Sequence, residues 1–154
     1  MKKLFIPLLL AGALLACKNQ QHPKNWNHIN PATEDHAHEL VSEKLELNNG
    51  AKWKVDRITN NNIENLKAII KEFNEGQDKS LKAYKKVGGD VQNGLAKMIS
   101  ECKMKGPGHM ALHKWLEPLM EDVAKLKQAT TDTMASRSFE VVHLHLNRYD
   151  QYFE

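Results

Sequence analysis

A cysteine, a methionine and two histidines lie within twelve residues of one another: Cys102, Met104, His109 and His113. A thiol, a thioether and two imidazoles form a soft set of donors. Imidazole suits several metals, whereas sulfur ligands favour Cu(I) or zinc. The residue types and spacing therefore predict a metal site for copper or zinc. The alternative is a group of core and solvated residues that binds no metal.

The predicted secondary structure explains how these side chains would meet. Cys102 shares the inward stripe of a helix with Met98, and a turn at Gly106-Pro107-Gly108 follows. His109 and His113 are four residues apart at the start of the next helix, so both imidazoles project from one face. Because the turn is short, Cys102 should face the histidine pair across it. Met98 is expected in the core rather than among the ligands.

Nothing in the sequence predicts an enzyme. Residues 109–113 read His-Met-Ala-Leu-His, so the glutamate that serves as the base in zinc proteases with this histidine spacing is missing. No nucleophile–base pair and no carboxylate dyad stands out elsewhere. The expected role of a metal site here is capture and delivery of the ion rather than turnover of a substrate.

Other histidines could serve as accessory metal ligands. His36 and His38 flank one alanine in a polar segment, and His145 borders the core stripe of the last helix. Solvated residues at 36 and 38 and a core-edge imidazole at 145 are the alternatives. Haem is not expected, because the Cys-x-x-Cys-His attachment signature is absent. Only non-covalent haem, for instance between Met98 and His145, would remain.

Pro118 falls inside the helix that begins near His109. Proline removes one backbone hydrogen bond and crowds the carbonyl of Lys114, so a kink is expected beside His113. This kink either opens space for a ligand or is a harmless break at which the helix restarts.

From residue 59 onward, apolar residues recur at intervals of three and four, the pattern of amphipathic helices. The sequence predicts a first helix of nearly 28 residues that ends at Gly88-Gly89 and overhangs its neighbours, and three further helices. We expect an antiparallel up-and-down four-helix bundle, in a mainly α protein. The inward stripes are Ile63, Leu66, Ile70, Phe73, Gln77, Ser80 or Leu81, Tyr84 and Val87; Val91, Leu95, Met98, Ile99 and Cys102; Leu112, Leu116, Leu119, Val123 and Leu126; and Phe139, Val142, Leu146, Tyr149 and Phe153.

A small β-hairpin is predicted before the bundle, around Asn48-Asn49-Gly50. A two-residue loop would place apolar and charged residues on one face. A three-residue loop, with Gly50 in the left-handed position, pairs Leu47 with Ala51, Leu45 with Trp53 and Glu43 with Val55. The three-residue loop is our prediction, and its apolar side chains should pack on the helices.

The N-terminus has the pattern of a secretory signal: Met1-Lys2-Lys3, an apolar run too short to span a membrane, and a small residue before Cys17. Leu14-Leu15-Ala16-Cys17 resembles the lipobox of bacterial lipoproteins, although Leu15 is bulkier than usual. The resemblance implies cleavage after residue 16, acylation of Cys17 (palmitate among the acyl chains) and a place in the bacterial cell envelope. Lys18, rather than Asp, implies the outer membrane. We expect a signal over 1–16, a flexible tether with a possible short helix over 17–44, and the hairpin and bundle over 45–154.

Charge and cysteine content limit the partners. The 154 residues include 22 basic and 19 acidic ones, and removal of the signal takes away two lysines, so the processed chain is nearly neutral. No basic stripe or aromatic platform predicts binding to nucleic acid. With Cys17 acylated, Cys102 has no disulfide partner in the chain and must be buried, reactive or metal-bound. The alternative function is a lipoprotein that docks another envelope protein without any metal.

Overall fold

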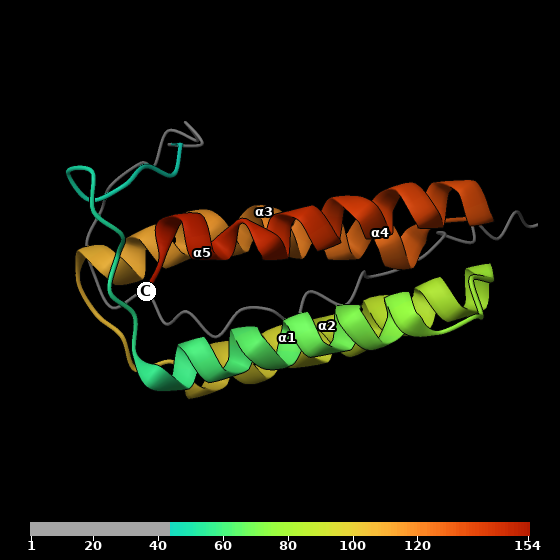
Figure 1. Ribbon diagram of the computed structural model, residues 1–154, viewed down its shortest axis with the longest axis horizontal. Coiled ribbons are helices and arrows are strands. Elements are labelled where there is room, and N and C mark those ends of the chain that lie inside the picture. Colours follow the sequence, from blue (N-terminus) through green and yellow to red (C-terminus); the bar gives the residue numbers. More distant parts are fainter. Residues whose placement is uncertain (1–43) are drawn as a thin grey trace, which may run out of the picture. The chain divides into compact units, whose positions relative to one another are not determined.

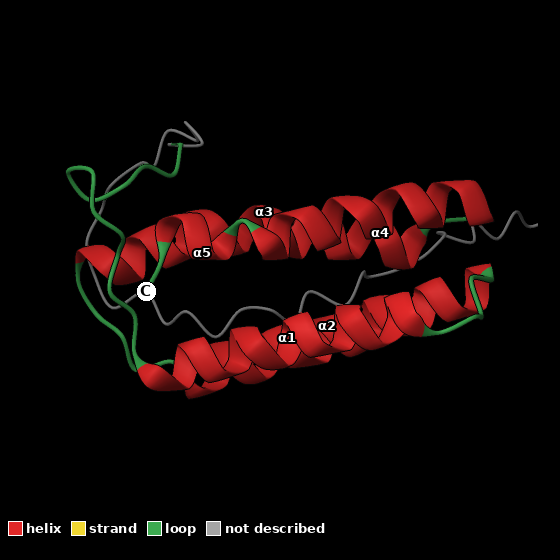
Figure 2. Cartoon of the chain, in the orientation of Figure 1, coloured by secondary structure: helices red, strands yellow, loops and turns green. Residues whose placement is uncertain are grey.

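The computed structural model describes residues 44–154, and this part of the chain is almost entirely helical (Figures 1 and 2). Four long helices follow one another: α1 (Arg57–Glu75), α2 (Leu81–Glu101), α3 (Pro107–Gln128) and α4 (Asp132–Asn147). A single-turn helix, α5 (Tyr149–Tyr152), continues α4 after Arg148. None of the helices among residues 44–154 is long and apolar enough to cross a membrane.

The four long helices run up and down, and each connection turns the chain back at the end it has reached (Figure 1). α1 packs along α2, α2 along α3, and α3 along α4, while α1 and α4 touch less extensively. The mainly helical, bundle-like fold expected from the periodicity is thus present.

The predicted stripes form the core. Every predicted inward residue of α3 and of the C-terminal helix is buried, from Leu112 to Phe153. In α1 and α2 the large buried residues include Ile63, Leu66, Leu95 and Met98. Ile99 is an exception, because its side chain is 42% exposed on the outer side of α2. Gln77 and Ser80 are also exposed, between the end of α1 and the start of α2.

The first predicted helix boundary was wrong. The break lies at residues 76–80, so α1 is 19 residues long and does not overhang. The end of α1 is stabilised by Lys79, whose amino group donates to the carbonyl of Gly76 at 2.6 Å, and Ser80 caps α2 by accepting from the N–H of Ala83. These local caps end one helix and begin the next. The spacing of three and four residues continues through this segment, so the sequence pattern did not indicate the break.

Gly88 and Gly89 lie inside α2 instead of ending a helix. A Cβ atom at Gly88 would lie 3.0 Å from the Lys127 side chain and 3.2 Å from that of Leu126, so this glycine permits close packing of α2 on α3. The glycine pair therefore reflects helix packing rather than a turn.

The predicted hairpin is not confirmed. The described residues form no strand, and the turn has a two-residue loop, Asn49-Gly50, closed by a bridge between Asn48 and Ala51. Positive φ angles at both loop residues, 52° and 87°, fit the mirror-image turn that favours Asn-Gly. The three-residue register with Leu47 opposite Ala51 was therefore wrong.

The segment after this turn pairs with the C-terminus instead. Trp53 donates its backbone N–H to the carbonyl of Tyr152 at 2.7 Å, and Glu154 donates to the carbonyl of Trp53 at 2.9 Å. Trp53 and Val55 pack against the helical core, as expected, but Leu47 is 41% exposed. Backbone groups that a hairpin would have used are thus satisfied by residues 99 to 101 positions away in the chain.

Candidate metal site and its surroundings

His109 and His113 occupy the first turns of α3, and their side chains meet. Their Nε2 atoms are 3.2 Å apart, and the rings lie edge to face with centroids 4.6 Å apart. The start of this helix is fixed by Gly106, whose φ of 76° suits glycine, and by Pro107 at the first helical position. The predicted histidine pair is therefore present on one face of α3, near its N-terminus.

The surroundings of His109 favour its neutral imidazole. Burial, followed by the positive charge of a protonated His113, lowers the pKa of His109 below its ordinary value of 6.5. A neutral ring has one nitrogen lone pair available for a metal, whereas an imidazolium has none. At neutral pH, then, His109 is in the protonation state that binding requires.

Glu117 adds a carboxylate beside the pair. Its Oε1 atom lies 3.8 Å from Nδ1 of His113, one helical turn further along α3. A carboxylate at this nitrogen favours the tautomer with the proton on Nδ1, which leaves Nε2 of His113 as an acceptor. In this tautomer of His113, the Nε2–H of His109 can donate to Nε2 of His113. To bind a metal ion through Nε2, neutral His109 would carry its proton on Nδ1 instead.

The spacing of the pair constrains the coordination geometry. Two nitrogens 3.2 Å apart, each about 2.05 Å from one metal ion, subtend an angle of about 103° at that ion. This angle is close to that of a tetrahedral site and far from linear two-coordination. The distance between the two nitrogens is therefore compatible with two ligands of a tetrahedral or trigonal site.

Cys102 does not join the pair. It ends α2, where its N–H donates to the carbonyl of Met98 at 2.9 Å, and its half-buried, unpaired thiol packs against the core. Within residues 44–154 no three His, Cys, Asp or Glu side chains lie close enough to hold a metal ion together. The close approach of Cys102 to both histidines that the short turn suggested is thus not found.

Met104 lies at the turn between α2 and α3, with its sulfur directed toward the start of α1. The hydroxyl of Thr59, which is fully buried, donates to Sδ of Met104 at 3.6 Å. Its methyl group lies 3.7 Å from the Cβ position of Gly108. Met104 therefore closes this end of the bundle, and it would have to leave Thr59 to bind a metal.

The accessory histidines separate into two groups. His36 and His38 lie outside the described residues, as do Cys17 and the rest of the lipobox. His145 is held on α4: Nδ1 lies 3.3 Å from Oδ2 of Asp122, and Nε2 lies 3.0 Å from the carbonyl oxygen of Trp115. Both ring nitrogens of His145 face acceptors on α3, so this histidine joins two helices instead of facing the His109–His113 pair.

Pro118 lies within α3, which continues from Pro107 to Gln128 without a restart. It lines an open cavity of about 500 Å³ between α3 and α4, together with Trp115, Asp122 and His145. The predicted kink at Pro118 stays a prediction, but the proline does border a cavity. The cluster around His145 was missed, because Asp122 carries no motif and only the fold brings it to the imidazole.

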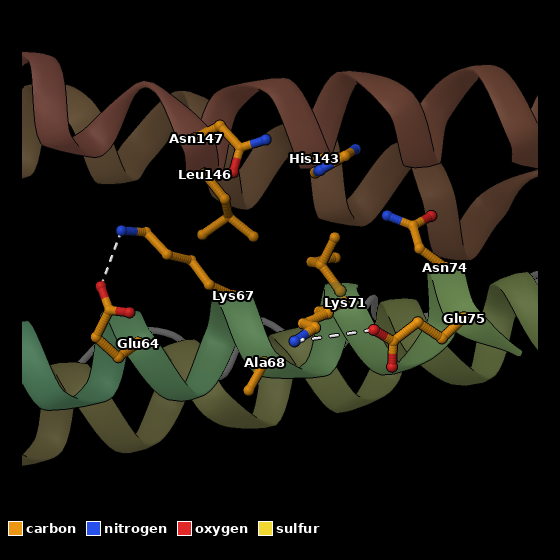
Figure 3. A pocket seen from close by; sticks show the side chains of 10 residues that line it. Glu64, Lys67, Ala68, Lys71, Asn74, Glu75, His143, Leu146 and Asn147 are labelled. Carbon is orange, nitrogen blue, oxygen red and sulfur yellow. Dashed lines mark hydrogen bonds and ion pairs between the residues drawn. The ribbon is translucent and has the colours of Figure 1, made fainter.

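A second cavity of about 500 Å³ lies between α1 and α4 (Figure 3). Its charged side chains pair with one another: Lys67 with Glu64 at 2.8 Å, and Lys71 with Glu75 at 3.8 Å. His143 faces this cavity from α4 (Figure 3). The internal pairing leaves little charge for a ligand.

Comparisons of the chain with models of protein families, with curated proteins and with solved structures find no match.

Proposed function

We propose that this chain is a non-catalytic lipoprotein of the bacterial envelope that binds and buffers a metal ion, copper first and zinc second. The approach of the two Nε2 atoms of His109 and His113 to 3.2 Å carries this proposal. A two-histidine site with open positions exchanges its metal more readily than a closed four-ligand site. Such a site suits capture and delivery.

The sulfur donors are assigned a secondary role. Cys102 ends α2 and Met104 lies in the connection that leads to the histidines, so residues 102–106 would have to rearrange to bring either sulfur to the pair. Thiolate or thioether in the open positions would favour Cu(I) over zinc. Water in those positions would leave a weaker, less selective site.

The test is a competitive Cu(I) titration, repeated with zinc, on the chain from residue 18 to residue 154, which contains every described element. We expect one ion per chain in the wild type and loss of this binding in the double variant His109→Ala/His113→Ala. Cys102→Ser reports on the thiol: weaker Cu(I) binding with unchanged zinc binding would place sulfur in the site.

His143→Ala is the matched control. This imidazole is also half-buried, with a side chain 30% exposed against 35% for His113, and it also lies 3.8 Å from a glutamate on its own helix. It has no second imidazole at 3.2 Å, so His143→Ala should bind metal as the wild type does. Equal binding by all four proteins would refute the assignment to His109 and His113.

Membrane attachment is the second part of the proposal, and it is supported by Leu14-Leu15-Ala16-Cys17. Acylation at Cys17 would hold the chain on the outer membrane through several acyl chains. Growth with labelled palmitate should yield a labelled protein in the membrane fraction. A Cys17→Ser chain that is still labelled would show that the lipobox is not used.

An interaction lipoprotein without metal is the other candidate function. The observation in its favour is the exposure of Met134, Val141 and Leu144 on α4, which are 52%, 48% and 51% exposed; the last two also line the cavity between α3 and α4. Large apolar side chains grouped on one helix are typical of surfaces that bind something. This candidate becomes the leading one if neither metal binds.

A further inference from the structure

We infer that the cavity between α3 and α4 binds a single-chain anionic amphiphile: its apolar chain lies on Pro118, Val141 and Leu144, and its carboxylate or phosphate head lies at the cationic rim. This site is separate from the histidine pair and does not depend on metal binding.

Pro118 lies at the wall of the cavity. Proline in a helix cannot make the usual backbone hydrogen bond and pushes its ring toward the preceding turn. Pro118 is exposed on α3 and, with Trp115, forms one wall of the cavity, while Val141 and Leu144 of α4 form the opposite wall. A volume of about 500 Å³ lies in the range of small-molecule sites.

The walls are apolar but remain in contact with water. Val141 is 48% exposed and Leu144 is 51% exposed, one helical turn apart on α4. Covering such side chains with a hydrocarbon chain is favourable in proportion to the apolar area removed from water. The walls therefore favour an aliphatic or aromatic group rather than a polar one.

The charged residues that line the cavity determine the sign of the head group. Among the described residues, Lys44 and Arg148 line the cavity as cations beside Lys114, and Asp122 contributes a carboxylate. Asp122 already lies 3.3 Å from Nδ1 of His145 and 3.2 Å from the amino group of Lys125. The cations of Lys44 and Arg148 favour an anionic head group, in contrast to the cavity of Figure 3, where lysines and glutamates pair with one another.

One buried donor beside the cavity also lacks an acceptor. Trp115 is 2% exposed, and its indole Nε1–H has no hydrogen-bond partner within residues 44–154. A buried donor without a partner costs free energy, and an oxygen atom of a bound ligand would remove that cost. Trp115 is therefore the residue that we expect to report on binding.

Calorimetry with dodecanoate tests the inference on the chain from residue 18 to residue 154, at pH 7.5 and below micelle formation. Two compounds with the same twelve-carbon chain test the head group: dodecyl phosphate replaces the carboxylate with another anion, and dodecylammonium replaces it with a cation. We expect saturable one-to-one binding of both anions, and at least about tenfold weaker binding of dodecylammonium. The ratio of the two anion affinities shows whether carboxylate or phosphate is preferred.

Two variants of cavity residues and one matched control locate the site. Val141→Glu and Arg148→Glu should each weaken dodecanoate binding by about tenfold, because each places a negative charge at the cavity. Met134→Glu makes a similar change on the same helix, at an exposed apolar residue that does not line the cavity. The affinity of this variant for dodecanoate should therefore stay within about twofold of that of the wild type. Thermal unfolding of the three variants checks that they are equally folded.

The indole N–H resonance of Trp115, assigned with a Trp115→Phe variant, should move when dodecanoate is added. Absence of saturable binding, equal affinities in the Val141→Glu and Met134→Glu chains, or equally tight binding of dodecylammonium would each overturn the inference.

Discussion

At the scale of single residues, the distance to a second imidazole distinguishes His109 and His113 from the other described histidines as candidate metal ligands. His109 and His143 are both half-buried imidazoles, but only His109 has a second imidazole nitrogen at 3.2 Å. That neighbour and the burial of the ring lower the pKa of His109, which keeps it neutral and available as a ligand. Residue type alone does not distinguish these two histidines.

A titration of the histidines by NMR tests this account. We expect His109 to take up its proton at a pH below 6.5, because burial and then the charge of His113 disfavour the imidazolium. His113→Ala should raise the pKa of His109 toward its ordinary value by removing the like charge. A His109 that titrates at 6.5 or above in the wild type would contradict the packing described for this ring.

The same shift makes stability depend on pH. A lowered folded-state pKa means that the unfolded chain binds the proton more readily than the folded chain. The contribution of His109 to the free energy of unfolding is therefore intact above pH 6.5 and is lost as the pH falls toward the folded-state pKa. Over that interval the free energy of unfolding of the wild type should fall more steeply than that of His109→Gln, as measured by urea unfolding at a series of pH values.

At the scale of the elements, two glycines of α2 differ in whether a side chain would fit at their positions. Gly89 and Gly94 are both helical, yet a Cβ atom at Gly89 would have no neighbour within 4 Å, whereas one at Gly94 would lie 2.6 Å from Cδ2 of Leu66. Leu66 is fully buried between α1 and α2 and has little room to move. The close contact of these helices thus depends on the absence of one side chain.

Alanine substitutions at the two glycines should have opposite effects. Gly89→Ala should stabilise the protein by about 0.5–1 kcal/mol, because alanine is the better helix former. Gly94→Ala has the same gain in helix propensity, but its new methyl group crowds Leu66. Overpacking of this kind costs about 1–3 kcal/mol of stability, so the variant should be less stable than wild type. Urea unfolding measures both, and stabilisation by Gly94→Ala would show that α1 and α2 are packed less closely than described.

At the scale of the whole molecule, the C-terminal residues close the bundle. Phe153 is 2% exposed, and its ring stacks on that of Tyr149 with centroids 4.8 Å apart. The backbone around it pairs with residues 53–55, which precede α1. The last residues therefore connect the beginning of the bundle to its end.

Phe153→Ala should lower the free energy of unfolding by about 3–5 kcal/mol, since it empties a buried aromatic site. Gln151→Ala is the control: this exposed residue lies two positions away, and its change should stay within about 0.5 kcal/mol. Chemical unfolding followed by circular dichroism measures both. A Phe153→Ala chain as stable as the Gln151→Ala chain would mean that the C-terminus contributes little to the core.

The sequence by itself determined the helical class, the inward stripes of α3 and α4, and the histidine pair. These features depend on spacings of three and four residues, which a helix converts directly into a shared face. The lipobox is equally local, although it lies outside the described residues and stays a prediction.

Tertiary structure decided the features that join distant parts of the chain. Gly88-Gly89 was read as a turn because glycine breaks isolated helices, but close packing on Leu126 gives it a place inside α2. Trp53 pairs with Tyr152 instead of Leu45, and Asp122 meets His145, because backbone and side-chain partners far apart in sequence satisfy these groups. Cys102 stays apart from the histidines because its position depends on the direction of a short turn. Spacing along the chain fixes which face of a helix a residue occupies, and only the packed fold fixes what that face meets.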